Sequence, residues 1–373
     1  MYIHEKENWT CFRWDNEKIL PTLTSVRHLQ GKLSGRMESL GFDLTERATL
    51  ESLILDVVDT SKIEGEFLNP VLVRSSIARK LGIESIEFQR IPRNIDGIVD
   101  VLLDATQNYD KPLTEERLWG WHNSLFQTGY SGYVKIDVAQ YRSAGMKAVS
   151  GSFGREKVHF EAPSHDRVPY EMNLFFDWLN NKNHLDLVLK SAISHLWLVT
   201  VHPFDDGNGR LARAIMDMLL ARSDGSKIRF YSMSNQIFKE HKRYNEIIEK
   251  TQKGTSDITE YLEWFLGCFE RALLSSEKNL EIILDKSRFW DRHKFTSIND
   301  RQRLILNYLY DHYDTEIGFL RTSVYAKIAK CSTDTALRDL QDLVIKGMLK
   351  AEDGGKKTNY LIVSPANLRI PKI

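Results

Sequence analysis

The sequence predicts a mainly α-helical protein: a helical core carrying one small β-hairpin flap, followed by a separate C-terminal winged helix-turn-helix unit. Three observations predict this fold class. Apolar residues recur with helical spacing through most of the chain. The stretch 141–165 breaks that spacing with strand-like and turn-forming residues. The last 80 residues follow an order of three helices and a hairpin.

The composition is that of a soluble globular protein. The 373 residues include 51 basic and 51 acidic side chains, so the formal net charge is zero, and 42% of the residues are hydrophobic. At roughly 150 residues per domain, this length suits two or three domains. These values exclude a disordered chain, a collagen-like chain and a highly charged nucleic-acid tail.

We expect a cytoplasmic protein with no membrane partner. No apolar run approaches the roughly 18 residues that a membrane span needs. The first nine residues lack the apolar core of a secretory signal. The cysteines Cys11, Cys268 and Cys331 lie far apart, which fits neither a disulfide framework nor a zinc cluster and suits a reducing compartment.

The elements of the first 300 residues are expected in this order. Residues 1–40 form a helical cap, for which packing is a simpler role than binding. A helix begins at Thr45 and ends near Gly65, and the next begins after Asn69 with Pro70 at the favoured first position. Strands at 146–149 and 157–160 flank a turn at 150–156. Further helices are expected at 95–108, 118–126, 169–179, 187–201, 210–221, 239–250 and 258–284.

The C-terminal unit, residues 294–373, reads as a winged helix. Helices are expected at 301–313 and 324–329, and a third begins at its cap Ser332 and stops at Gly347. The unit has 13 basic and 9 acidic residues, a net charge of +4, which leaves −4 for the remainder. Arg338, Lys356 and Lys357 could reach DNA phosphates, whereas Asp334 and Asp339 oppose this. DNA binding, protein docking and dimerisation all stay open.

The segment 202–213 reads HPFDDGNGRLAR and carries the chemistry. His202 ends a buried helix and can accept a proton from a hydroxyl. Asp206 suits a divalent ion such as Mg²⁺, which would bridge phosphate oxygens. Arg210 and Arg213 lie three residues apart on one helix surface and suit phosphates. Backbone N–H groups at the helix start complete an anion cradle, and they belong to Gly207, Asn208 and Gly209. Phe204 is expected to anchor the loop in the core.

This segment matches the signature of the Fic (filamentation induced by cyclic AMP) family, His-x-Phe-x-(Asp/Glu)-Gly-Asn-Gly-Arg-x-x-Arg, at every specified position. The resemblance implies a Fic domain over residues 41–290 that transfers AMP from ATP to a Ser, Thr or Tyr hydroxyl of a target protein and releases pyrophosphate. It also implies roles for the segment: His202 activates the hydroxyl, Asp206 holds Mg²⁺, and the phosphates are bound by Gly207, Asn208, Gly209, Arg210 and Arg213.

The resemblance extends to two further features. The hairpin 146–160 is similar to the family's flap, which clamps the nucleotide and docks the target, so Val149, Ser150 and Gly151 are expected near the nucleotide. Relatives often place two adjacent tyrosines near the adenine. This chain has Tyr244 followed by Asn245, which leaves Tyr244 as the candidate for base stacking.

The last expectation is an inhibitory segment at the end of the helix predicted at about 45–65. Residues 60–65, TSKIEG, resemble the inhibitory motif (Ser/Thr)-x-x-x-Glu-(Gly/Asn) of self-inhibited Fic proteins, within an inhibitory helix at about 45–65. If Glu64 pairs with Arg213, it occupies the guanidinium that would hold the γ-phosphate, and ATP would bind with its phosphates misaligned.

Two function classes follow from these features. The first is a protein adenylyltransferase, autoinhibited by Glu64, that modifies a target protein and in some conditions itself, and in a bifunctional form also removes AMP. The second is a winged-helix transcription regulator whose Fic domain senses nucleotide. A base at His202 and a metal ligand at Asp206 favour the first, because a sensor needs no base. A homodimer is compatible with either.

Overall fold

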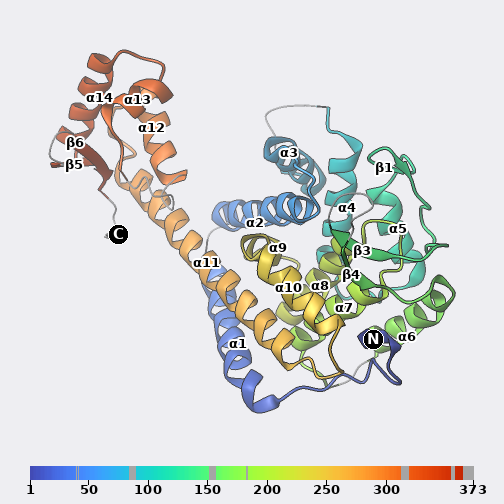
Figure 1. Cartoon of the computed structure of the whole chain (residues 1–373). Helices are drawn as coiled ribbons and strands as arrows, with labels where there is room; N and C mark the ends of the chain where they lie inside the picture. The colour runs from blue at the N-terminus through green and yellow to red at the C-terminus, as the bar shows by residue number, and fades with distance from the viewer. Residues whose placement is uncertain are drawn as a thin grey trace. The chain divides into compact units, whose positions relative to one another are not determined.

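The computed structural model describes the chain except residues 39, 41, 84–89, 151–156, 182–183, 312–318, 354–357 and 364–373. The chain divides into two compact units, Met1–Ser276 and Glu277–Ile373, and helix α11 (Thr259–Arg292) runs through the division. The mainly helical fold class is confirmed, with only two-stranded sheets among the described residues (Figure 1). The expected domain bounds at 40 and 290 stay predictions.

The first unit is a helical assembly with two small hairpins. Its helices are α1 (Asn16–Glu38), α2 (Phe42–Ile63), α3 (Pro70–Leu81), α4 (Arg93–Gln107), α5 (Glu115–Leu125), α6 (Val168–Asn180), α7 (Leu187–Val201), α8 (Asn208–Asp224), α9 (Met233–Lys239), α10 (His241–Gln252) and the first part of α11, with short 3₁₀ turns η1 (Ile3–Glu5) and η2 (His165–Arg167).

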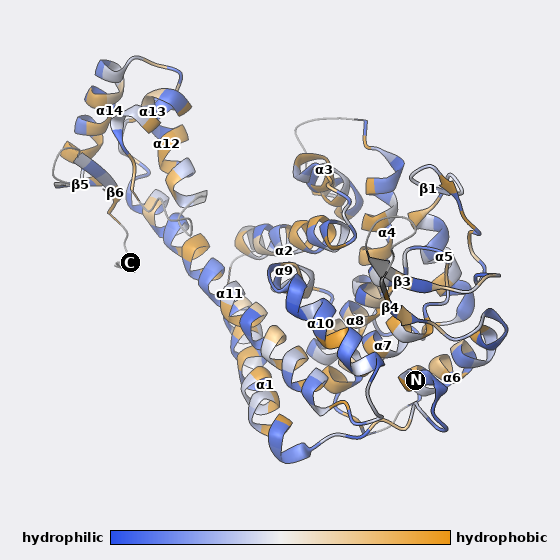
Figure 2. Cartoon of the chain, in the orientation of Figure 1, coloured by the Kyte–Doolittle hydropathy of each residue, from blue (hydrophilic) through white to orange (hydrophobic). Residues whose placement is uncertain are grey.

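Helix α7 lies at the centre of this unit, against α8 (Figure 1). Every residue from Val188 to Val201 is buried, so the mostly apolar sequence of this helix reflects packing on all sides. Asp186 caps the helix by accepting hydrogen bonds from the N–H groups of Val188 and Leu189. By contrast, apolar and polar residues are both spread along α11, as suits a helix with one buried face (Figure 2).

Helix α2 is joined to the core by buried charges. Arg229 donates to Asp56 of α2 and to Asp217 of α8, each at 2.7 Å, and all three side chains are 2% exposed. Ser232 adds a hydrogen bond to Asp56. Burial and the neighbouring Asp217 raise the pKa of Asp56 to about 7, whereas Arg229 opposes that rise. This network fixes where α2 delivers its C-terminal turn.

The hairpin expected at 146–160 forms as β3 (Lys147–Ser150) and β4 (Lys157–Glu161), paired antiparallel. A second hairpin, β1 (Tyr130–Ser131) with β2 (Val134–Lys135), was not expected, because two-residue strands are too short to show an alternating pattern. The helix expected at 239–250 forms as α10, which begins at His241. Glu240 separates it from α9, which ends at Lys239.

The second unit has the expected order of elements. Besides the end of α11, it contains α12 (Asp300–Asp311), α13 (Thr322–Ile328), α14 (Thr333–Ile345) and the antiparallel strands β5 (Leu349–Asp353) and β6 (Thr358–Ile362). Ser332 caps α14 by accepting from Thr335 N–H, and Gly347 follows the helix at φ 69°. Lys356 and Lys357 of the expected wing lie outside the described residues.

No helix within the described residues is both long and apolar enough to span a membrane.

Candidate active site

His202 occupies the turn that ends α7. Its backbone is left-handed at φ 51°, and its N–H still donates to Leu198 O at 2.9 Å, so the chain leaves the helix abruptly at this residue. The half-buried imidazole contacts Val199 O through Nδ1 at 3.3 Å. Because a carbonyl oxygen only accepts, this contact assigns the proton to Nδ1 and leaves a lone pair on Nε2. Burial also lowers the pKa of His202, which favours the neutral form that can act as a base.

Phe204 and Asn208 close the loop that follows His202. The Asn208 side chain accepts from Phe204 N–H at 2.9 Å and donates to Phe204 O at 2.8 Å. The Phe204 ring is fully buried and stacks on His122 with ring centroids 4.2 Å apart, so the expected anchor forms. Since the Asn208 amide is engaged within the loop, the group that Asn208 can offer to an anion is its backbone N–H at the start of α8.

Gly207 requires glycine for its backbone conformation, and Gly209 leaves space that the Glu64 side chain occupies. Gly207 adopts φ 83°, and a Cβ there would lie 2.7 Å from Cε2 of Phe126. A Cβ on Gly209 would lie 2.2 Å from Oε1 of Glu64. The first N–H groups of a helix lack intrahelical acceptors and carry partial positive charge, so this end of α8 favours an anion.

Arg213 belongs to the second turn of α8, and the last turn of α2 holds its side chain. Its side chain is 1% exposed, with Nε donating to Thr60 Oγ1 at 2.7 Å and Nη2 to Thr60 O at 3.0 Å. Nη2 also donates to Glu64 Oε1 at 2.7 Å. The structure therefore places Glu64 against Arg213, the two residues that the sequence analysis paired. Within the described residues, Nη1 of Arg213 is buried and has no hydrogen bond of good geometry, and Tyr244 is a polar neighbour of this guanidinium.

Arg210 makes a second pair with the segment that directly follows α2. Its Nη1 donates to Oε2 of Glu66 at 3.1 Å, while Nη2 lies 4.0 Å from Asp206 and the guanidinium stacks over the Phe126 ring. Asn94 of α4 donates to the other oxygen of Glu66 at 2.8 Å. Among the described residues, the buried Nε of Arg210 has no partner. Sequence reasoning missed Glu66, and its place two residues after Glu64 is the one signal that could have suggested it.

Asp206 presents an oriented carboxylate. The side chain is 40% exposed, Ser131 Oγ of β1 donates to Oδ2, and Gly207 N–H donates to Oδ1. Nε2 of His122 lies 3.2 Å from the carbonyl oxygen of Asp206, and Ala139 N–H donates to Nδ1 of His122 at 3.1 Å. The second contact assigns the His122 proton to Nε2, which therefore donates to Asp206. Burial lowers the pKa of His122 to about 4 and keeps the ring neutral.

The segment after β2 is hydrogen-bonded to the loop 202–207. Asp137 N–H donates to Asp205 Oδ2 at 3.0 Å, and Arg142 N–H donates to Pro203 O at 2.9 Å. Arg142 Nε donates to His202 O at 2.8 Å. Sequence reasoning did not identify Ser131, His122 or Arg142 as parts of the site, because they lie 60 to 84 residues from their partners and form no contiguous motif.

The structure describes some of the residues that are expected near the nucleotide. Val149 and Ser150 belong to the backbone of β3, and Gly151 lies outside the described residues. Tyr244 is buried on α10, with its hydroxyl 3.3 Å from Nε2 of His195 and its ring 5.6 Å from that of Trp264. Burial raises the pKa of Tyr244 to about 12. A role for Tyr244 in base stacking stays a prediction.

Two family models match the chain. Residues 2–83 match a domain of unknown function, DUF4172, and residues 112–220 match the Fic/DOC family. The second match contains α5, both hairpins, α7 and most of α8, so it encloses His202 and its loop.

Relatives and solved structures are consistent with the second match. A protein adenylyltransferase Fic from Nematostella vectensis is 32% identical over 232 residues, which cover 61% of this chain and 49% of the relative. One from Aedes aegypti is 25% identical over 236 residues, which cover 61% and 42%. The chain thus spans less than half of each of these relatives.

A crystal structure of a Fic family protein from Desulfovibrio desulfuricans G20 has a TM-score of 0.54 at 20% identity, covering 93% of this chain and 96% of that chain. A Fic-domain signaling protein from Bacteroides thetaiotaomicron VPI-5482 has a TM-score of 0.53 at 18% identity, covering 71% and 97%. At these identities the similarity concerns the fold. The complete motif at 202–213, the geometry around it and the match over residues 112–220 together identify a Fic domain in this part of the chain.

Proposed function

We propose that this protein transfers AMP from ATP to a Ser, Thr or Tyr hydroxyl of a target protein. The observation that carries the proposal is the contact of His202 Nδ1 with Val199 O, which assigns the proton to Nδ1 and leaves Nε2 able to take the proton of a hydroxyl. Relatives named protein adenylyltransferase support this choice of reaction.

Phosphate binding would satisfy the groups that the loop leaves unpaired. A buried N–H without an acceptor costs free energy, and both Arg210 and Arg213 bury one such group within the described part of the chain. Phosphate oxygens are suitable acceptors for guanidinium groups, and the α8 N-terminus adds backbone N–H groups beside them. We assign the phosphates of ATP to these groups, including the N–H groups of Gly207, Asn208 and Gly209.

In the proposed step, one bond to the α-phosphorus forms and one breaks. The target hydroxyl oxygen forms a bond to the α-phosphorus, and its proton passes to Nε2 of His202. The bond from the α-phosphorus to the oxygen bridging to the β-phosphorus breaks, and pyrophosphate leaves with that electron pair. Arg210 and Arg213 would hold the phosphates in line with the incoming oxygen, which is the positioning that such a transfer needs.

Asp206 fits a magnesium ion held mainly by phosphate. The described residues contain no cluster of three or more metal-binding side chains. Mg²⁺ in nucleotide sites typically needs only one or two protein carboxylates because phosphates and water complete its coordination. Asp206 is partly exposed and its orientation is fixed by Ser131 and Gly207. When bound, the ion would neutralise charge on the phosphates and on the leaving pyrophosphate.

The same geometry supports inhibition by the α2 turn. Glu64 occupies Arg213, and Glu66 occupies Arg210, so the two arginines proposed to bind phosphate each face a carboxylate. A carboxylate beside a phosphate site repels the anion and competes for the N–H donors. We propose that Glu64 is the principal inhibitory residue and that Glu66 adds to it.

Incubation with labelled ATP tests the transfer reaction. In a chain that carries Glu64→Gly, His202→Ala should lose incorporation of label into protein while ATP binding, measured by calorimetry, stays within about threefold of the value for Glu64→Gly alone, because the arginines and the α8 N-terminus remain. Loss of incorporation with intact binding supports His202 as the base. Undiminished incorporation in this variant contradicts the proposal.

DNA binding by the second unit is a second candidate function. Asp339, which would oppose DNA on the surface of α14, is instead buried and bonded to Arg301, Tyr325 and Asn299. Arg338 is exposed on the same helix. A salt-dependent mobility shift on random duplex DNA that is weakened by Arg338→Ala would support this activity, and no shift at low salt would contradict it.

A further inference from the structure

Arg142 is a buried side chain whose hydrogen bonds all go to main-chain carbonyl groups. Its side chain is 3% exposed. Nε donates to His202 O at 2.8 Å, Nη1 to Ala144 O at 2.7 Å, and Nη2 to Pro163 O and to Val201 O, the latter at 3.4 Å. One guanidinium therefore binds four carbonyl groups from three separate places in the chain.

Those three places are the two ends of the flap and the end of α7. Ala144 lies three residues before the start of β3, and Pro163 lies two residues after the end of β4. Val201 and His202 form the C-terminal end of α7. The hairpin is otherwise closed at its base by Ala162 N–H donating to Met146 O at 3.0 Å. Arg142 is thus the side chain that ties both ends of the hairpin to the backbone of the proposed base.

The chemistry of guanidinium suits this arrangement. Its N–H groups project in fixed directions within one plane, so a single arginine can fix several acceptors relative to one another. The carbonyl groups at a helix C-terminus carry partial negative charge, which favours a cation at that end of α7. A lysine would keep the charge but would bind fewer of these carbonyl groups, with less defined directions.

We propose that Arg142 is a positioning residue that keeps the flap and His202 in a fixed relation to each other. The proposal rests on the proposed AMP transfer, in which the flap and His202 act on the same substrate. Among the described residues, the side chain of Arg142 donates hydrogen bonds only to main-chain carbonyl groups, so it acts through the atoms that it holds. Loss of alignment between a base and a hydroxyl slows transfer with little change in nucleotide affinity.

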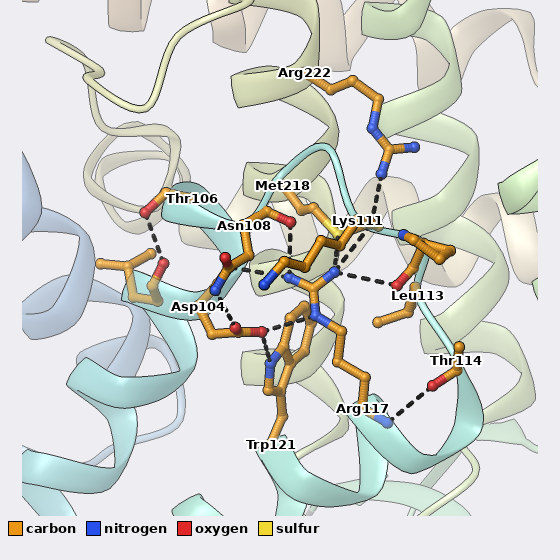
Figure 3. Close-up of polar contacts among 12 residues, drawn as sticks. Asp104, Thr106, Asn108, Lys111, Leu113, Thr114, Arg117, Trp121, Met218 and Arg222 are labelled. Carbon is orange, nitrogen blue, oxygen red and sulfur yellow. Dashed lines mark hydrogen bonds and ion pairs between the residues drawn. The ribbon is translucent and has the colours of Figure 1, made fainter.

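Arg117 of α5 provides a matched control. It binds main-chain carbonyl groups in a similar way, with Nη1 donating to Lys111 O at 3.0 Å and Nη2 to Asp104 O and Asn108 O at 3.0 and 3.1 Å (Figure 3). Its Nε also pairs with the Asp104 carboxylate at 2.8 Å. None of these partners belongs to the loop 202–207 or to the flap. Arg117→Lys should therefore lower stability without a selective effect on turnover.

The test compares Arg142→Lys with Arg117→Lys in the full chain carrying Glu64→Gly. We expect Arg142→Lys to lower kcat on the order of tenfold or more while the Kd for ATP stays within about twofold, and Arg117→Lys to leave kcat within about twofold. Hydrogen exchange of the β3 and β4 amides should be faster in the Arg142 variant only.

Other results would overturn either the positioning role of Arg142 or the proposed function. A folded Arg142→Lys variant with unchanged kcat overturns the positioning role, as does an equal loss in both lysine variants, which would indicate general destabilisation. If Glu64→Gly transfers no AMP, the proposed function fails, and hydrogen exchange then decides the inference alone. Equal exchange at the flap in both variants would overturn it.

Discussion

Oε1 of Glu64 accepts a hydrogen bond from Nη2 of Arg213 at 2.7 Å, and Gly209 leaves the space that the carboxylate occupies. The turn after α2 therefore reaches the start of α8 at a position where a Cβ would meet the Glu64 carboxylate. This pairing joins the N-terminal region of the chain to the segment that contains His202. The same glycine borders the proposed phosphate site and admits the carboxylate that we propose competes with phosphate for Arg213.

Gly209→Ala should destabilise the protein through that contact. The new Cβ would lie 2.2 Å from Oε1 of Glu64, so the carboxylate or the helix must move, at a cost of about 1–3 kcal/mol. In a chain that carries Glu64→Gly, most of this cost should vanish. Urea unfolding of the four proteins of this double-mutant cycle measures the coupling. Equal costs in both backgrounds would show that Glu64 does not occupy the space above Gly209.

Glu66→Gln should raise AMP transfer when Glu64 is already glycine. Removing a charge 3.1 Å from Arg210 strengthens the attraction of this site for phosphate, so we expect a lower KM for ATP and transfer raised on the order of threefold at low ATP concentration. Steady-state rates over a range of ATP concentrations provide the measurement.

Glu51→Gln is the matched control for Glu66→Gln. Glu51 also lies in the α2 region and pairs with an arginine, Arg74, but both side chains are about half-exposed and no motif residue is involved. It should leave KM unchanged. A fall in the transfer rate of Glu66→Gln would instead make Glu66 a residue that positions Arg210 for catalysis.

Arg229→Gln should be strongly destabilising. It would leave Asp56 and Asp217 buried without their common cation, and breaking a buried pair in this way costs about 3–5 kcal/mol. Arg74→Gln removes an exposed ion pair with Glu51 and should cost no more than about 1 kcal/mol. Chemical denaturation compares the two variants. Similar midpoints would contradict the role of the Arg229 network in holding α2.

His122 should make the stability of the protein depend on pH below 6.5. Its pKa is about 4 in the folded chain against 6.5 when unfolded, so between these values the unfolded state binds more protons. Stability is fully present above pH 6.5 and falls on acidification, by about 2 kcal/mol at pH 5 from this residue alone.

The variant His122→Gln isolates that contribution, since other buried histidines titrate in the same direction. Gln keeps a donor that can reach Asp206 O but has no group that ionises. Its unfolding free energy should vary less between pH 7 and pH 5 than that of the parent. Identical pH dependence in the two proteins would mean that His122 is not the titrating group.

The sequence predicts the contiguous parts of this site well. The motif 202–213 concentrates the loop, the helix end and both arginines in twelve residues, and the apolar run before it marks α7 as a core helix. Glu64 could be paired with Arg213 only because a second motif lay upstream of the first.

The parts assembled from distant segments could not be predicted in the same way. Arg142, His122 and Ser131 act on main-chain or carboxylate oxygens 60 to 84 residues away, and no periodicity or motif marks such contacts. The hairpin of β1 and β2, which carries Ser131, has too few residues per strand to show alternation. Arginine side chains are mostly exposed in proteins, and only the fold shows that Arg142 is buried against carbonyl groups.

Incorporation of labelled AMP by the Glu64→Gly chain, compared with the parent chain and with a Glu64→Gly, His202→Ala double variant, tests the central claim most directly. Release of Arg213 should raise incorporation into protein by on the order of tenfold or more over the parent, and the double variant should lose it. Mass spectrometry would then locate the modified hydroxyl. Incorporation that stays at the parent level in Glu64→Gly, or that persists in the double variant, would contradict the account.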